Sequence, residues 1–171
     1  MERKRFDDYP CPIARAANIF GDWWVPLLMR EAMYGVETFN EFQDNLGISK
    51  NILNRRLSRL VDEGIFQKDL YQRPSRYRYI LTEKGKEALS ILAAMAAWSD
   101  SWLFTDQDYP IEIRDRNTGR RVRPRIVDKE TGEPLEMENL VLAPGPGFPD
   151  SKEARNWRFG ERGEVSVELP G

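Results

Sequence analysis

The chain has 171 residues, a formal net charge of −2, 40% hydrophobic residues and 32% charged residues, which suits one domain with a real core plus an appendage. It has no histidine, which argues against hydrolysis by a catalytic triad and against ordinary zinc catalysis. Its single cysteine excludes an internal disulfide framework and fits a reducing cytoplasm. No apolar run approaches the roughly 20 residues of a membrane-spanning helix. We therefore expect a cytoplasmic protein that is not an enzyme and has no membrane partner, metal or cofactor.

Three short helices are expected near the start of the chain. The third begins with Thr38 and has Glu41 three residues later, the spacing of a capping box. Gly47 follows as a tight turn before a further helix, which is the helix-turn-helix pattern. The expected helices span residues 12–20, 23–34 and 38–46.

The segment 49–64 predicts an amphipathic helix with Ser49 as its N-cap and Gly64 at its end. Its apolar residues recur three and four positions apart. The opposite face carries residue types that bind phosphates and base edges. These are Lys50, Asn51, Asn54, Arg55, Ser58 and Arg59.

Two strands, 65–70 and 77–81, follow with a basic wing at 71–76 between them. Between residues 49 and 79 there are eight basic and three acidic residues, a local balance of +5. Such clustering is typical of a DNA-binding surface, whereas a merely solvated helix face would not require the adjoining hairpin to be basic too.

A long helix over 83–104, capped by Thr82, has an apolar stripe too long for a small core to cover. Small residues beside large aromatic ones favour close packing of two helices, so we expect this stripe to seal a homodimer. The alternative is packing against the chain's own tail. Four tryptophans could line a cavity for a small planar effector, although plain core is the commoner role: Trp23, Trp24, Trp98 and Trp102.

An ordered series of short motifs over residues 9–104 resembles the HxlR-type winged helix-turn-helix transcriptional regulators. The resemblance implies a mainly α (α+β) fold and a dimeric bacterial regulator related to the MarR type, with dimers built from the terminal helices. The motifs include Cys11-Pro12-Ile13, Gly21-Asp22-Trp23-Trp24, Phe39-Asn40-Glu41-Phe42, Leu53-Asn54-Arg55-Arg56-Leu57 and Tyr79-Ile80-Leu81-Thr82-Glu83-Lys84-Gly85.

By position, segment 49–64 resembles the family's recognition helix, and a dimer would place two of these about one turn of DNA apart on a pseudo-palindromic operator. Arg56 and Arg59 could contact phosphates or form surface ion pairs, and the phosphate contact is slightly favoured. The residues expected to approach the major groove are Ser49, Lys50, Asn51, Asn54 and Arg55. Those expected on the backbone or in the minor groove, at the wing tip, are Arg73, Ser75 and Arg76.

Cys11 has two interpretations. Some members of the family resemble thiol-based redox switches at this position, and a helix N-terminus favours the reactive thiolate. The commoner role is a small buried residue at the dimer interface, and it is the favoured one.

The rest of the chain, 105–171, predicts a small β-rich appendage of two similar hairpins, with turns at 117–119 and 130–133, and a turn-rich linker at 143–147. Some relatives with such an extension carry cysteines in comparable turns, resembling a zinc ribbon. Here Thr118, Asp128 and Thr131 stand roughly in their place, so we expect no metal.

Residues 1–104 are thus expected to form a dimeric, sequence-specific regulator that binds double-stranded DNA, more often a repressor than an activator in this kind of family. The alternative is a winged-helix protein-interaction module that does not read DNA.

Overall fold

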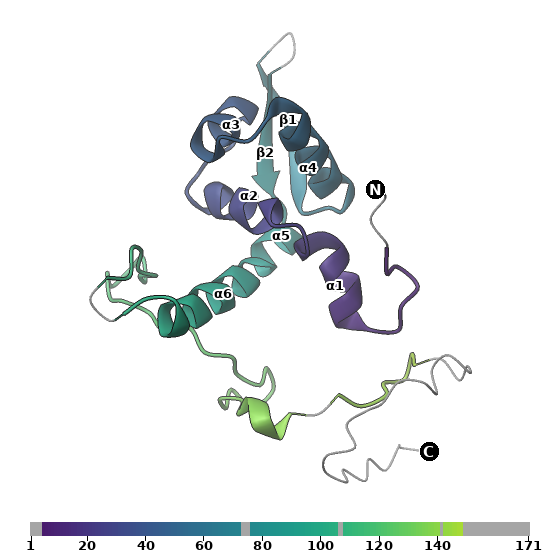
Figure 1. Cartoon of the computed structure of the whole chain (residues 1–171), viewed down its shortest axis with the longest axis vertical. Helices are drawn as coiled ribbons and strands as arrows, with labels where there is room; N and C mark the ends of the chain where they lie inside the picture. The colour runs from purple at the N-terminus through teal and green to yellow at the C-terminus, as the bar shows by residue number, and fades with distance from the viewer. Residues whose placement is uncertain (1–4, 73–75, 106–107, 141, 149–171) are drawn as a thin grey trace.

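The computed structural model describes residues 5–72, 76–105, 108–140 and 142–148, and it has a mixed α+β fold (Figure 1). Four helices precede a two-stranded antiparallel hairpin, and two more helices follow it. The elements are α1 (Pro12–Phe20), α2 (Trp24–Met33), α3 (Phe39–Leu46), α4 (Lys50–Asp62), β1 (Phe66–Gln72), β2 (Arg76–Leu81), α5 (Glu83–Glu87), α6 (Leu89–Trp102) and the 3-10 helix η1 (Met137–Asn139).

The helix-turn-helix forms as the local signals predict. The Thr38 hydroxyl accepts a hydrogen bond from the Glu41 backbone N–H, and the Glu41 carboxylate accepts one from the Thr38 N–H at 2.9 Å, which completes the capping box. Gly47 has a φ of 61°, a left-handed conformation that glycine adopts without strain. Ser49 then caps α4 by accepting from the Ile52 N–H.

The core lies where α2, α3, α4 and the hairpin meet. Of the apolar stripe of α4, Leu53, Leu57 and Leu60 are buried and Val61 is half-buried, as the periodicity predicts, whereas Ile52 is 40% exposed. Phe42 of α3 meets Phe66 of β1 edge to face, with ring centroids 6.1 Å apart. The buried apolar residues are Val25, Leu28, Met29, Phe42, Ile48, Leu53, Leu57, Leu60, Ile65, Phe66 and Tyr79.

The hairpin pairs Phe66 with Leu81 at its base and continues outward toward the wing. It also receives the segment before α3, because the Tyr79 N–H donates to the Glu37 carbonyl at 2.7 Å and Thr38 forms a bridge with Arg78. No local sequence pattern indicates these contacts of β2 with Glu37 and Thr38. They fix the hairpin against the helix-turn-helix. The wing tip at 73–75 lies outside the described residues.

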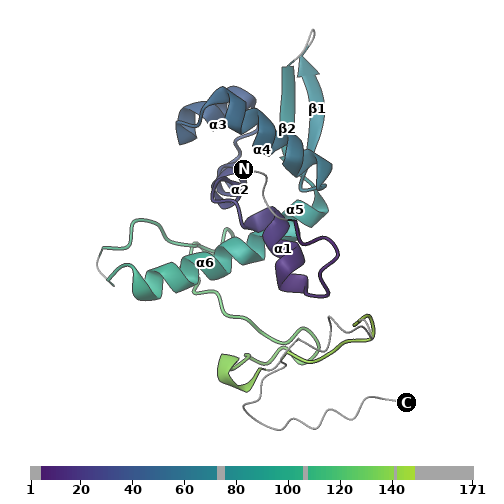
Figure 2. The same cartoon turned by 45° about the vertical axis from the view of Figure 1, so that its right-hand side comes forward.

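The single helix expected over 83–104 is divided at Ala88 into α5 and α6. Gly85 is packed so closely on the base of the hairpin that an added Cβ would lie 2.3 Å from the Ile65 carbonyl oxygen. The Thr82 hydroxyl also donates to the Gly64 carbonyl at 2.6 Å. These contacts fix α5 against the winged-helix unit, by which we mean α1–α4 and the β1–β2 hairpin. Helix α6 runs away from α3, α4 and the hairpin in both views (Figures 1 and 2).

The described part of the tail is largely irregular. Each of its two expected hairpins closes with a single bridge, Arg114 to Arg121 and Val127 to Pro134, and neither contains a strand in the described residues. No helix in the described ranges is both long and apolar enough to cross a membrane. Nor do three or more His, Cys, Asp or Glu side chains come together there in a way that could hold a metal ion.

Candidate nucleic-acid interface

The outer face of α4 is fully available to a partner. Three leucines of α4 are buried in the core, whereas the polar side chains that we assigned to the major groove are all exposed. The Ser49 hydroxyl is engaged as the helix cap. The exposed residues on this face are Ser49, Lys50, Asn51, Asn54 and Arg55.

Arg56 and Arg59 are turned toward the protein. The Arg56 Nε lies 2.6 Å from a carboxylate oxygen of Asp22, whose side chain is only 4% exposed. The Arg59 Nη2 donates to the carbonyl of Asn18, also across the α1–α2 side of α4. Of the two roles considered for these arginines, the intramolecular one is seen in the single chain, because their guanidinium groups reach oxygen atoms of Asp22 and Asn18. Their contact with phosphates stays a prediction.

A groove of about 420 Å³ runs beside the outer face of α4, between α3 and the hairpin. The Lys68 Nζ lies 4.1 Å from the ring centroid of Tyr77 and 5.9 Å from that of Tyr79. Burial raises the pKa of the Tyr79 phenol, with a smaller effect of Tyr77. The groove is lined by Thr38, Phe39, Asn40, Asn54, Lys68, Tyr71, Arg76, Tyr77 and Tyr79.

Sequence reasoning missed Lys68 and Tyr77 as members of this surface. The signal was available, because Lys68 pairs with Tyr79 in the antiparallel register, and alternation along β2 then places Tyr77 on the same face. At the wing, Arg73 and Ser75 lie outside the described residues, so nothing is added to their predicted role. Arg76 opens β2 and lines the groove.

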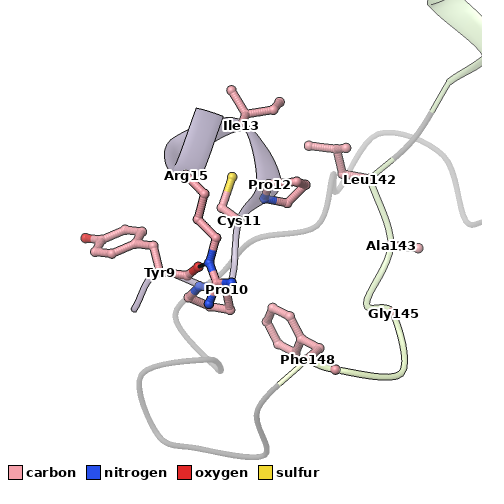
Figure 3. Close-up of a pocket in the computed structure, with 11 residues that line it drawn as sticks. Tyr9, Pro10, Cys11, Pro12, Ile13, Arg15, Leu142, Ala143, Gly145 and Phe148 are labelled. Atoms are coloured by element: carbon pink, nitrogen blue, oxygen red, sulfur yellow. Dashed lines mark hydrogen bonds between the residues drawn. The ribbon is translucent and has the colours of Figure 1, made fainter. Parts of the chain in front are cut away.

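Cys11 lies at the N-cap of α1, beside a segment of the tail (Figure 3). Its Sγ accepts a hydrogen bond from the Ala14 N–H at 3.4 Å, while the nearby Arg15 Nε donates to the Tyr9 carbonyl at 3.0 Å. A pocket of about 430 Å³ separates this helix start from residues 142–148, with Phe148 facing Pro10. The thiol is half-buried, between the two environments that the sequence left open.

The four tryptophans do not share one environment in the described part of the chain. Trp24 is half-buried against the core, whereas the side chains of Trp23, Trp98 and Trp102 are 80%, 59% and 74% exposed. The two on α6 belong to a longer exposed row at spacings of four, three and four residues, which is one face of a helix. This row, the α6 stripe, consists of Ile91, Met95, Trp98 and Trp102. Leu89 and Leu92, also expected in the stripe, pack against the chain's own core instead.

Comparisons with known proteins agree with this architecture. A family profile described as HxlR-like helix-turn-helix matches residues 19–107. The HTH-type transcriptional regulator Rv3095 of Mycobacterium tuberculosis, itself uncharacterised, is 34% identical over 137 residues, which cover 80% of this chain and 87% of that protein.

Two solved structures extend the likeness. PA1607, described as a candidate transcription factor, superposes with a TM-score of 0.74 at 31% identity and covers 82% of this chain and 99% of its own. The redox regulator HypR in its reduced form has a TM-score of 0.51 at 27% identity and covers 58% of this chain and 100% of its own. The chain therefore belongs to the HxlR-like helix-turn-helix family of transcriptional regulators.

Proposed function

We propose that this protein is a homodimeric regulator that binds a specific double-stranded DNA operator and acts as a repressor. The observation that carries the proposal is the division of α4 into a buried apolar face and an exposed polar, cationic face. A helix that is anchored on one side and carries Arg and Asn on the other is suited to enter the major groove, where these side chains pair with guanine and adenine.

Within this interface, Asn54 and Arg55 are the base-reading residues. Ser49, Lys50 and Asn51 surround the N-terminus of the helix and contact the DNA backbone or the first bases. Arg76, with Arg73 and Ser75 in the wing, contacts the backbone or the minor groove. The groove between α3 and the hairpin supports this arrangement because Arg76 and Asn54 line it together.

The dimer is formed by the α6 stripe. Large apolar side chains that recur along one helix face and stay exposed in a single chain favour burial against a second copy. Pairing of α6 would present two recognition helices to one face of the duplex, about one helical turn of DNA apart, on a pseudo-palindromic operator. Repression then follows from occupancy of a promoter by this dimer.

A thiol-based control of DNA binding is a second proposal, and it rests on Cys11. This thiol is half-buried at a helix start and borders a pocket, and HypR, a structural relative, is a redox regulator. Diamide should lower operator affinity in the wild type and leave Cys11→Ser unchanged. Equal loss of affinity in both proteins would assign the effect to something other than this thiol.

The DNA-binding proposal is tested by gel shift with Arg55→Ala, Arg76→Ala and the control Lys86→Ala on α5. Arg55→Ala should weaken operator binding by about 1–3 kcal/mol and relax base preference. Arg76→Ala should weaken binding to all duplexes and reduce the salt dependence of log K by about one unit. Lys86→Ala should behave as wild type. If the wild type binds no duplex even at low salt, the protein is instead an interaction module with a winged-helix fold.

A further inference from the structure

Two turns of the tail have the same construction. In the first, the Asp115 carboxylate accepts hydrogen bonds from the backbone N–H groups of Asn117 and Thr118, at 3.1 and 2.7 Å. In the second, Asp128 accepts from Glu130 and Thr131, at 2.8 Å each. A glycine of positive φ follows each threonine, and its N–H returns to the aspartate carbonyl. The second turn therefore repeats the first at an offset of 13 residues.

The two turns carry opposite charges. Residues 114–125, here called the basic turn, hold six arginines and one aspartate, while residues 127–138, the acidic turn, hold five carboxylates and one lysine. At the equivalent positions of the repeat, arginine in the first turn is replaced by glutamate in the second: Arg120 by Glu133, Arg123 by Glu136 and Arg125 by Glu138. The shared hydrogen bonds need only Asp, Thr and Gly, so the turn geometry does not account for these charges.

The basic turn is attached to the helix that bears the α6 stripe. The Arg121 guanidinium stacks 3.9 Å from the ring centroid of Tyr109, and its Nη2 lies 3.6 Å from a carboxylate oxygen of Asp100. Asp100 lies between Trp98 and Trp102 in the sequence of α6. The basic turn is consequently held beside the C-terminal half of the helix that we propose as the dimer seam (Figure 1).

Within the part of the chain that the structure describes, the charges at the tips of both turns are left unneutralised. Arg116, Arg120, Glu130 and Glu133 are exposed, and none of them forms an ion pair with another residue in the described ranges. Among the described residues, one ion pair joins the two turns, between Arg125 and Glu136 at their bases.

We infer that the tips are partnered by a second copy of this chain, with the basic turn of each protomer facing the acidic turn of the other. A twofold dimer forms each such contact twice, so a charge-reversed repeat is self-complementary across the axis. DNA is the less suitable occupant of the basic turn, because the acidic turn, with a balance of −4, lies close in sequence and would repel phosphates. The inference rests on the homodimer of the proposed function.

A charge-swap experiment on the full-length chain tests it. One variant is Arg116→Glu/Arg120→Glu, and the other is Glu130→Arg/Glu133→Arg. Each variant alone should dimerise about 10-fold more weakly than wild type at low salt, because two attractive charge pairs per turn become repulsive. This loss of affinity should shrink at about 0.5 M salt, where exposed charges are largely screened. An equimolar mixture of the two variants should form heterodimers with near wild-type affinity, since every facing pair is then complementary again.

The controls separate the alternatives. Lys84→Glu/Lys86→Glu makes the same charge change on α5 and should leave dimer affinity unchanged. Wild-type dimer affinity in both swap variants would overturn the inference. A loss of DNA affinity in Arg116→Glu/Arg120→Glu, with dimer affinity unchanged, would also overturn it and would assign the basic turn to DNA binding. A wild type that sediments as a monomer would instead contradict the proposed homodimer itself.

Discussion

Helices α4 and α6 both carry an apolar stripe, and the two stripes differ in what covers them. On α4, Leu53, Leu57 and Leu60 are at most 1% exposed, because α2, α3 and the hairpin close over them. On α6, the side chains of Trp98 and Trp102 remain more than half exposed in the single chain. The same helical periodicity thus leads to a completed core in one region and to an open apolar face in the other.

The difference separates folding of the single chain from its assembly with another molecule. The winged-helix unit contains all the contacts that position α4, including the capping box, the buried core and the pairing of β2 with the segment before α3. Stability of this unit should therefore be a property of one chain. The α6 stripe can be covered only by another molecule or by parts of the chain outside the described ranges, so its mutations should act on assembly.

The largest expected effect is on folding of the winged-helix unit. Leu57→Ala should lower the free energy of unfolding by about 2–5 kcal/mol, because it leaves a cavity in a fully buried site. Urea unfolding measures this loss, which should not vary with protein concentration. A loss below about 1 kcal/mol would show that α4 is not held by this core.

The next effect is on assembly. Trp98→Glu/Trp102→Glu should weaken the dimer by about 2 kcal/mol or more, or about 30-fold. Buried aromatic side chains contribute much of the binding free energy of an interface, and the new carboxylates would be hydrated only in the monomer. Sedimentation equilibrium measures the dissociation constant. Circular dichroism should show an unchanged fold, since both side chains are exposed in the single chain. Dimers of wild-type affinity would remove the stripe from the interface.

A smaller effect distinguishes neighbouring arginines of α4. Arg56→Ala should lower the free energy of unfolding by about 1–3 kcal/mol, since it leaves the buried Asp22 carboxylate without its cation, and the partial exposure of Arg56 moderates the loss. Arg55→Ala should change it by less than about 0.5 kcal/mol, because Arg55 is exposed. Thermal unfolding of both variants measures the contrast, and equal stabilities would contradict the inward role of Arg56.

The smallest effect is a pH dependence at the start of α3. Hydrogen bonds from Thr38, its hydroxyl first and then its backbone N–H, lower the pKa of Glu41 below its ordinary 4.5. The folded-state pKa is therefore below the unfolded one, so the stabilisation is present above about pH 4.5 and is lost as the pH falls further. Glu41→Gln should cost about 0.5 kcal/mol at pH 7, after allowance for solvent screening, and progressively less toward pH 3. A cost that does not vary with pH would exclude the ionised carboxylate as its source.

The sequence could predict what local chemistry determines. Thr38, Ser49 and the three-and-four spacing of α4 define the helix-turn-helix to within a residue or two, because caps and stripes act within one or two turns. It could not predict the break at Ala88, nor the close packing of Gly85 on the Ile65 carbonyl, 20 residues earlier in the chain. Nor could it separate Arg55 from Arg56 with certainty, since the Asp22 partner lies on another helix.

The tail illustrates the same limit. The Thr-Gly turns were readable because an aspartate three residues before a threonine forms them locally. The short bridges that replace the expected hairpins, and the approach of residues 142–148 to Cys11, depend on packing that no pattern in the sequence specifies.

Joint binding of one duplex by two copies of α4 can be tested by sequencing the genomic DNA fragments that copurify with the wild-type protein and with Arg55→Ala. The wild-type fragments should be enriched in an inverted repeat whose half-site centres are about 10 base pairs apart, and Arg55→Ala should lose this enrichment. Fragments with no common sequence, or a single half-site retained equally by both proteins, would contradict it.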